Sequence, residues 1–243
     1  ENITLFGESA GAWSVALQSS VSPDGNLFSK AICQSGGMNA FFNIDRGNRW
    51  GELFIKTAHE MGFKINDLHN LDHKQITKTA SQMKHTMITD GVWLSPEVGF
   101  APIADGNFLP PDPIKNFKDS SIRLIIGTTS DEYRLWSEFE PYYLNLDKEN
   151  FYKRLEKIFK KETVKKIADI YLSDLGDNQE GNKYKHALSN LMTDWTFGMH
   201  ALDLLERHQN KSYGYFFNEP SPLLGGKLGA YHASELPYVF GSA

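Results

Sequence analysis

The sequence predicts an α/β protein whose sheet is mostly parallel and is flanked by helices. Short β-prone runs occupy residues 3–6 and 28–34, and a helix-compatible segment rich in small residues, 10–19, lies between them. A continuous apolar run at 122–126 is typical of a further buried strand. Because parallel strands are joined by crossover helices and covered on both faces, this alternation of strand, helix and strand favours a parallel sheet.

The later elements follow from periodicity and turn composition. Residues 147–172 carry apolar side chains at helical spacing with lysine and glutamate between them, which predicts one helix with a solvated face. Residues 94–117 are rich in Pro, Gly and Asp and predict an irregular connection. No internal repeat or low-complexity linker interrupts the pattern, so one domain is expected. The remaining expected elements are helices at 46–62, 73–85 and 184–208 and a last strand at 213–217.

Composition excludes several functional classes. The chain has 243 residues, a formal net charge of −5 and no dense block of Lys and Arg, so a nucleic-acid surface is not expected. No apolar run is long enough to span a membrane, and no signal peptide is recognised. The single cysteine, Cys33, permits no internal disulfide. Without metal-ligand spacing or a phosphate-binding glycine loop, we expect neither metal nor cofactor.

A five-residue motif marks a candidate nucleophile. Residues 7–11 read G-E-S-A-G, which matches G-x-S-x-G, and they lie where an expected strand turns into an expected helix. That context presents the serine hydroxyl of Ser9 on a strained turn, with glycines two positions away on each side to avoid clashes. The backbone N–H of Ala10 would then donate to the oxyanion that forms during acyl transfer. This motif in this context is typical of the α/β-hydrolase fold.

A nucleophilic serine needs a base, and the base needs an acid, in the chain order Ser, Asp or Glu, His. Asp131 and Glu132 follow the strand at 122–126 and are both candidates for the acid. An acidic pair that begins a helix is also ordinary capping, which is the interpretation favoured for Asp131. His232, in the loop after the last strand, is the favoured base. Seven other histidines compete with it: His59, His69, His73, His85, His186, His200 and His208.

Several stretches of the chain also match one family's motifs, in order. They are Glu1 to Gly11, Phe28 to Gly36, Pro102 to Gly106 (P-V-x-D-G in the family), Gly127 to Glu132, Asp194 with Phe197 (D-x-x-F), and His232 to Gly241 (H-x-x-E-x-x-x-V-F-G). Jointly they resemble the type-B carboxylesterases, a family that includes para-nitrobenzyl esterases and cholinesterases. The resemblance implies an α/β-hydrolase fold and hydrolysis of small carboxylic esters through an acyl-enzyme. It assigns Ser9 as nucleophile, Glu132 rather than Asp131 as acid, and His232 as base.

The chain also departs from the family pattern. The family's upstream glycine-rich segment, which supplies the other oxyanion donors, has no match, and neither do the first strands of the sheet. Residues 1–243 therefore resemble the carboxyl-terminal portion of a single α/β-hydrolase domain with its N-terminal strands absent, and slow turnover of esters is expected from this portion alone. Phe63 stands where secreted animal members tend to have a cysteine, which favours a cytoplasmic enzyme.

Other interpretations stay open at this point. Glu8 is either a carboxyl group buried beside the site or a turn residue that bonds backbone donors. Ser35 either supports the site or only ends a strand. The alternatives to an active enzyme are a non-catalytic binding module of esterase-like fold and an inactive fragment, while the oligomeric state is open. The aromatic candidates for a substrate pocket are Trp93, Trp136, Phe139, Tyr142 and Tyr143.

Overall fold

The computed structural model describes residues 2–63, 70–89, 100–175 and 181–242, and at 84–89 it describes the backbone alone. The chain divides into two compact units. One combines Glu1–Asn39 with Asp112–Ala243, and the other is Ala40–Pro111. The first unit contains the sheet and all the residues predicted for catalysis. The prediction of one domain over 1–243 stays a prediction.

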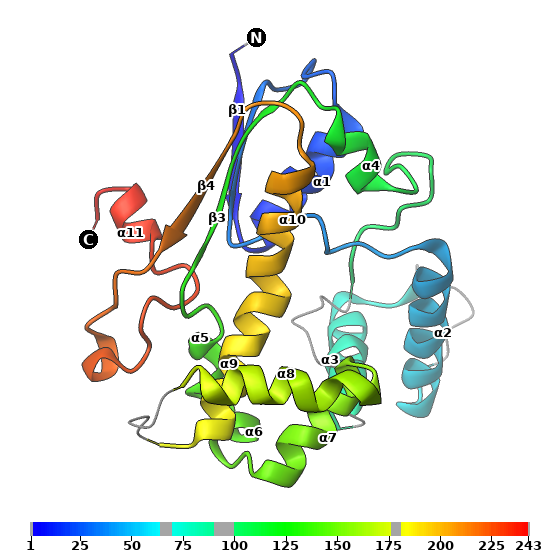
Figure 1. Ribbon diagram of the computed structural model, residues 1–243. Helices are drawn as coiled ribbons and strands as arrows, with labels where there is room; N and C mark the ends of the chain where they lie inside the picture. The colour runs from blue at the N-terminus through cyan, green and yellow to red at the C-terminus, as the bar shows by residue number, and fades with distance from the viewer. Residues whose placement is uncertain (1, 64–69, 90–99, 176–180, 243) are drawn as a thin grey trace. The chain divides into compact units, whose positions relative to one another are not determined.

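The sheet of the first unit has four strands in the order β1-β2-β3-β4, and all three neighbouring pairs are parallel. At its carboxyl edge, Glu8, Gln34, Gly127 and Tyr215 lie in register across the four strands. The predicted parallel α/β architecture is therefore confirmed, and each predicted strand has its counterpart (Figure 1). The strands are β1 (Thr4–Glu8), β2 (Lys30–Gln34), β3 (Arg123–Thr129) and β4 (Ser212–Phe217).

Helix α1 (Ala10–Val21) follows β1 directly and packs on β1 and β2 through its apolar residues. A second long helical run crosses β3 and β4 (Figure 1). It consists of α9 (Lys183–Thr193), the π-helix η2 (Asp194–Gly198) and α10 (Met199–Arg207). The predicted helix at 184–208 is thus present, but it widens at η2. A single π turn of this kind accommodates an extra residue within a helix and re-aims the side chains that follow.

The predicted helix at 147–172 is wrong as one element. It is two helices, α7 (Lys148–Ile158) and α8 (Lys161–Ser173), separated by extended backbone at Phe159 and Lys160. The physical reason is the phase of the buried residues. At about 100° per residue, Leu155 of α7 and Val164 of α8 would fall on opposite sides of one straight helix, yet both are buried. The break lets each helix bury its own apolar face.

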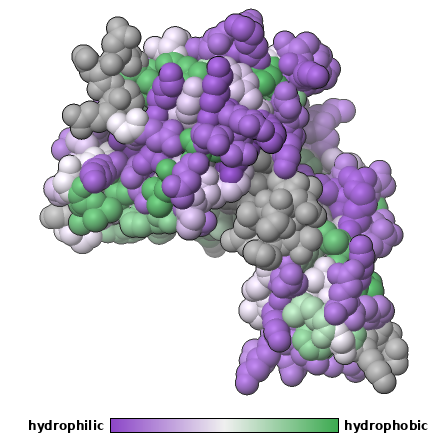
Figure 2. Space-filling model, turned by 90° about the horizontal axis from the view of Figure 1, so that it is seen from below, coloured by the Kyte–Doolittle hydropathy of each residue, from purple (hydrophilic) through white to green (hydrophobic). Residues whose placement is uncertain are grey.

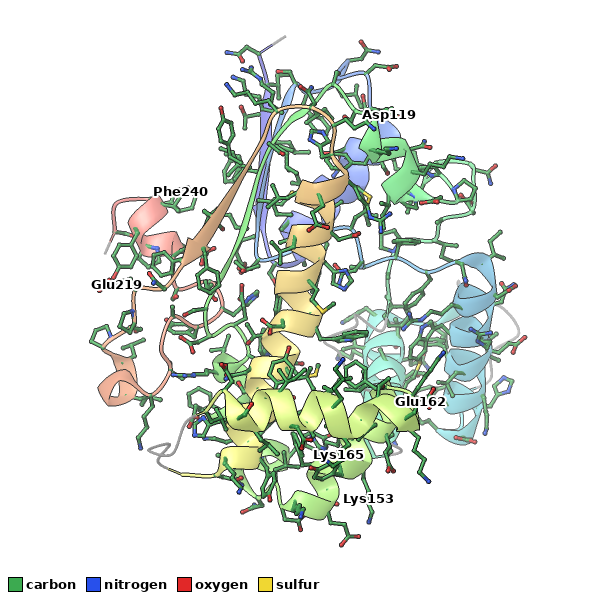
Figure 3. All side chains as sticks on the ribbon, in the orientation of Figure 1. Asp119, Lys153, Glu162, Lys165, Glu219 and Phe240 are labelled. Carbon is green, nitrogen blue, oxygen red and sulfur yellow. The ribbon has the colours of Figure 1, made fainter. Side chains whose placement is uncertain are left out.

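The predicted solvated face of α7 and α8 is present. Lys153 pairs with Glu149 at 2.6 Å, and Lys165 pairs with Asp169 at 2.6 Å, all with exposed side chains. Lys153 and Lys165 are labelled in Figure 3, and the surface seen from below in Figure 2 is largely hydrophilic. Isolated exposed pairs of this kind add little stability, so the face serves mainly for solvation.

Short helices complete the first unit. The irregular connection predicted at 94–117 is wrong at its end, where Asp112 caps the helix α4 (Pro113–Lys118) by accepting from the N–H of Lys115 at 3.0 Å. Residues 94–99 lie outside the described part of the chain. The remaining elements are α5 (Arg134–Ser137), α6 (Pro141–Leu144), the 3-10 turn η3 (Leu223–Gly226) and α11 (Leu236–Val239).

The second unit is a helical pair. Helices α2 (Ile44–Glu60) and α3 (His73–Thr89) pack together around Phe54 and Met83, close to the ranges expected from periodicity. Phe42 stacks on Trp50 with ring centroids 5.8 Å apart.

Candidate active site

The turn between β1 and α1 holds Ser9 in a strained conformation. Its φ of 55° and ψ of −118° lie outside the regions that non-glycine residues ordinarily adopt. Two backbone bonds hold the turn, since Ser9 N–H donates to Gln34 O at 2.8 Å and Ser9 O accepts from Trp13 N–H at 3.0 Å. The motif thus forms the strand–turn–helix context from which Ser9 was predicted to be a nucleophile.

Close packing around the turn explains two glycines, Gly7 in β1 and Gly36 just after β2. A Cβ on Gly7 would lie 2.4 Å from the carbonyl carbon of Gly11, and one on Gly36 would lie 2.7 Å from Ala12 Cβ and 3.0 Å from Ser9 O. A Cβ on Gly11 would meet nothing within 4 Å among the described residues. The steric argument is therefore right for Gly7 and wrong for Gly11. Sequence reasoning missed Gly36, because its neighbour in space is distant along the chain.

Three predicted side chains converge at the carboxyl edge of the sheet. His232 Nε2 lies 2.8 Å from Ser9 Oγ, and His232 Nδ1 lies 2.6 Å from Glu132 Oε2. Glu132 is fully buried, and its second oxygen accepts from the N–H of Thr129 at 2.9 Å. With its proton on Nδ1, the imidazole donates to Glu132 and can accept the hydroxyl proton of Ser9. The geometry suits proton transfer from a serine to a histidine.

The neighbouring acid, Asp131, has a different role from the one expected. Helix α5 begins at Arg134, and no side chain caps it. The Asp131 carboxylate instead accepts from the N–H of Ala230 at 3.0 Å and pairs with Arg134 at 2.9 Å. The capping interpretation of Asp131 is therefore wrong. Asp131 contacts the loop that carries His232, at a point the sequence places 99 residues away.

Two further carboxylates lie beside the imidazole. Glu8 Oε1 is 3.1 Å from His232 Nε2, and it is buried without a hydrogen bond. Glu235, 2% exposed, accepts from the Gln34 side-chain amide at 3.2 Å. The first alternative for Glu8, a group buried beside the site, agrees with this geometry. Sequence reasoning missed Glu235, whose only signal was its place in the His232 motif.

Burial and charge oppose each other at this cluster. Burial alone lowers the pKa of His232, but the hydrogen bond and charge of Glu132, with the charges of Glu8 and Glu235, outweigh it, and the pKa is raised. Burial raises the pKa of Glu8, although the nearby His232 acts in the opposite direction. Burial likewise raises the pKa of Glu235. Three carboxylates around one imidazole therefore favour its protonated form.

Aromatic rings enclose the imidazole on its apolar side. The rings of Trp136 and Phe197 lie 5.0 and 4.9 Å from that of His232, centroid to centroid. Phe197 comes from the π-helix η2, so the widened turn contributes directly to the surroundings of His232. A pocket role for the aromatic candidates stays a prediction. Tyr143 is buried, Tyr142 is partly buried, Phe139 is 58% exposed, and Trp93 lies outside the described residues.

Ser35 and Ala10 occupy the positions expected of them. Ser35 directly follows β2 and has a φ of 55°, its N–H donates to Gly127 O at 2.8 Å, and its hydroxyl is buried without a hydrogen-bond partner. Ala10 is the first residue of α1, so its N–H belongs to the donors that a helix cannot satisfy internally. Its part in an oxyanion hole stays a prediction.

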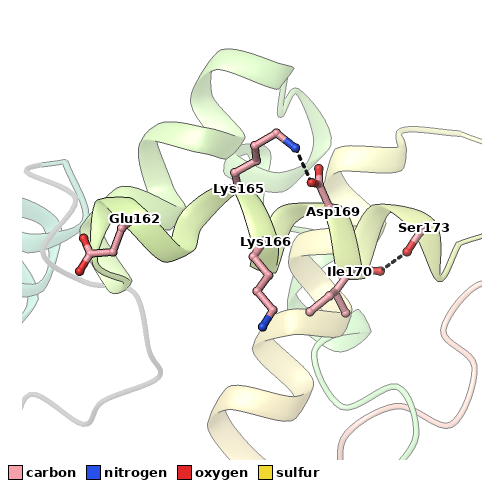
Figure 4. A pocket seen from close by; sticks show the side chains of 6 residues that line it. All are labelled: Glu162, Lys165, Lys166, Asp169, Ile170 and Ser173. Carbon is pink, nitrogen blue, oxygen red and sulfur yellow. Dashed lines mark hydrogen bonds and ion pairs between the residues drawn. The ribbon is translucent and has the colours of Figure 1, made fainter.

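A hollow on the outer face of α8 is a separate feature (Figure 4). It is open, and none of the three converging side chains lines it. Lys165 and Asp169, on its wall, pair with each other. Among the described residues, no group of three His, Cys, Asp or Glu side chains could hold a metal ion. The described helices include none long and apolar enough to cross a membrane.

Comparison with known proteins gives concordant matches along the chain. A family model described as the carboxylesterase family matches residues 1–243. The bile salt-activated lipase of Homo sapiens is 28% identical over 99% of the chain and 34% of its own length. The para-nitrobenzyl esterase of Bacillus subtilis (strain 168) is 28% identical over 100% of the chain and 47% of its own length. Among solved structures, the carboxylesterase EST55 of Geobacillus stearothermophilus aligns with a TM-score of 0.74 at 26% identity, over 99% of the chain and 48% of that protein. The chain therefore spans less than half the length of these relatives.

Proposed function

The chain belongs to the carboxylesterase family, and from that premise we propose that it acts in the hydrolysis of carboxylic esters with Ser9 as nucleophile, His232 as base and Glu132 as acid. The observation that carries the proposal is the relay of two short contacts, 2.8 Å from Ser9 Oγ to His232 Nε2 and 2.6 Å from His232 Nδ1 to Glu132 Oε2. The strained turn under Ser9 supports it, because such turns present a serine for attack.

In the proposed reaction, Ser9 Oγ attacks the ester carbonyl carbon while His232 Nε2 takes the hydroxyl proton. Glu132 stabilises the resulting imidazolium through its bond to Nδ1. The tetrahedral intermediate carries its negative charge on the former carbonyl oxygen, to which Ala10 N–H donates. His232 then protonates the leaving alcohol, and an acyl-enzyme remains on Ser9. Water, deprotonated by the same imidazole, releases the carboxylic acid and restores Ser9.

The proposed substrates are short-chain aryl or alkyl esters. The names of two relatives, para-nitrobenzyl esterase and phenmedipham hydrolase, point to small molecules. The aromatic rings of Trp136 and Phe197 beside His232 suit apolar substrate groups. The acidic residues Glu8 and Glu235 in the same cluster disfavour anionic esters.

A cytoplasmic location is also proposed. Its support is the single cysteine of the chain, Cys33, which is buried and whose pKa burial raises to about 12. A buried thiol with a raised pKa is unreactive, and an unpaired cysteine is typical of proteins in a reducing compartment. Fractionation of the native source with an antibody to the chain tests the proposal, and recovery from the medium contradicts it.

The decisive experiment for the activity is covalent labelling with a fluorophosphonate probe, which reacts with activated serines. Wild-type protein should label, and Ser9→Ala should not. Ser14→Ala is the matched control, because Ser14 is an exposed serine of the same helix and should not matter. Labelling that persists in Ser9→Ala overturns the assignment. A wild-type protein that folds but does not label favours the non-catalytic binding module or the inactive fragment over the proposed activity.

A further inference from the structure

We propose that Asp131 is a positioning residue, which clamps the loop carrying His232 onto the turn carrying Glu132 and thereby sets the distance between base and nucleophile. The inference rests on the proposed function, since it concerns the same site. It assigns distinct roles to two consecutive acids, because Glu132 contacts the imidazole whereas Asp131 contacts the backbone that carries it.

The two segments run side by side and are bonded backbone to backbone. Asp131 N–H donates to Ala230 O at 3.0 Å, and His232 N–H donates to Glu132 O at 3.3 Å. The same two residues form a second hydrogen bond through the Asp131 side chain, since Ala230 N–H donates to Asp131 Oδ2 at 3.0 Å. Asp131 and Ala230 thus exchange two hydrogen bonds, two residues before the imidazole. Both bonds between Asp131 and Ala230 are shorter than the single backbone bond at His232, so the main attachment of the loop is at Ala230.

The Asp131 carboxylate is held in place on its other sides. Oδ1 pairs with Arg134 at 2.9 Å, and Oδ2 also accepts from the hydroxyl of Ser130 at 2.8 Å. The Asp131 and Arg134 side chains are only 18% and 30% exposed. Charged acceptors make stronger hydrogen bonds than neutral ones, and a fixed carboxylate loses little entropy when it binds the loop.

The loop is shaped to fit the carboxylate. Gly229 has a φ of 59°, and a Cβ there would lie 2.4 Å from Asp131 Oδ2 and 2.9 Å from an Arg134 nitrogen. Ala230 is fully buried. The backbone thus approaches the carboxylate more closely than any side chain would allow. If the carboxylate is removed, the buried N–H of Ala230 loses its partner.

The consequence for the site is geometric. Catalytic contacts tolerate little displacement, and a misplacement of about 1 Å can lower a rate by about 10²-fold. His232 must satisfy Ser9 and Glu132 at once, at 2.8 and 2.6 Å. A loop released at Ala230 would sample positions in which one of these contacts is lost. Asp131 therefore acts on the reaction through His232 and not by touching the substrate.

The test compares Asp131→Ala with Asp131→Asn in the 243-residue chain. Two readouts are measured, the rate constant of fluorophosphonate labelling and the titration of the His232 imidazole by nitrogen-15 NMR, assigned with His232→Gln. Asp131→Ala should label about 10- to 100-fold more slowly, in proportion to the displacement of the base. Its His232 midpoint should fall, because the contact to Glu132 weakens. Asp131→Asn keeps an oxygen that accepts from Ala230, so its labelling rate and its His232 midpoint should both lie close to the wild-type values.

The matched control is Asp147→Ala. The Asp147 carboxylate also accepts one backbone N–H, that of Asn150 at 2.8 Å, but at the start of α7. It should label at the wild-type rate. Should Asp131→Ala fail to fold, Arg134→Gln removes only the ion pair that holds the carboxylate and should slow labelling about 2- to 3-fold, the size of one modest interaction.

The outcomes separate this inference from the proposed function. Wild-type rate and titration in folded Asp131→Ala, or in Arg134→Gln if Asp131→Ala does not fold, overturn the inference while Ser9 labelling stands. Labelling that falls only in proportion to the unfolded fraction, with an unchanged His232 titration, overturns it as well. If wild-type Ser9 does not label, the proposed function fails, and the His232 titration still decides whether Asp131 positions the ring.

Discussion

The two sides of the candidate site are held in different ways. On the nucleophile side, Ser9 is fixed by close backbone packing of Gly7 and Gly36 and by backbone hydrogen bonds. On the base side, His232 is fixed by the carboxylates of Glu132 and Asp131. The first arrangement depends on volume and is insensitive to pH. The second depends on the charge of Glu132, so a substitution there that preserves shape can still disable it.

The largest expected effect is on the base side. Glu132→Gln preserves shape and removes the charge that holds the imidazole, so fluorophosphonate labelling should slow by about 10³- to 10⁴-fold. Glu138→Gln is the control, because Glu138 is also a poorly exposed acid, paired with Lys185 at 2.6 Å and not with His232. Labelling of Glu132→Gln within tenfold of wild type would contradict the assignment of the acid.

On the Ser9 side of the site, where packing is close, one added methyl group should already have an effect. Gly7→Ala places a Cβ against the backbone of Gly11, so we expect a loss of about 1–3 kcal/mol from overpacking and labelling at least about 10²-fold slower. Gly11→Ala adds the same methyl where nothing lies within 4 Å, and it should be neutral or stabilising by up to about 1 kcal/mol in α1. Thermal melts and labelling rates check both. Equal behaviour of the two variants would refute the packing argument.

The charge-dependent side should give labelling a pH dependence. Only neutral imidazole can accept the Ser9 proton, and the pKa of His232 is raised, so the labelling rate should rise with pH around a midpoint above 6.5. Glu8→Gln and Glu235→Gln each remove a charge that favours imidazolium, and each should lower this midpoint. A wild-type midpoint at or below 6.5 would mean that burial outweighs the three carboxylates.

The smallest effect concerns stability. The pKa of buried Glu235 is raised in the folded state, so its contribution to stability is present below the unfolded-state pKa and is lost as pH rises through the folded-state pKa. Glu235→Gln has no carboxyl group to ionise, so it does not lose stability as the pH rises, and its side-chain oxygen can still accept from Gln34. Its melting temperature relative to wild type should therefore be higher at pH 8 than at pH 4.5. The exposed Glu219→Gln, labelled in Figure 3, is the control, and an equal difference at both pH values speaks against a buried charge.

Local pattern was enough for much of the fold and for the nucleophile. Three segments could each be assigned from their own residues: the strand before Gly7, the helix of small residues after Ser9, and the apolar strand at 122–126. Such assignments succeed because hydrophobic periodicity depends only on near neighbours along the chain. The same reasoning failed at Phe159 and Lys160, where continuous helical spacing concealed two buried faces of opposite phase.

The sequence by itself determined the parallel order of elements and the turn at Ser9, and through family resemblance it predicted Glu132 rather than Asp131 as the acid. Only the tertiary structure decided that Glu8 lies beside His232, that Glu235 accepts from Gln34, that Gly36 lies against Ser9, and that Asp131 bonds the loop at Ala230. The reason is separation along the chain. These contacts join residues tens to hundreds of positions apart, where periodicity carries no information, and they exist only because parallel strands bring their carboxyl ends to one edge.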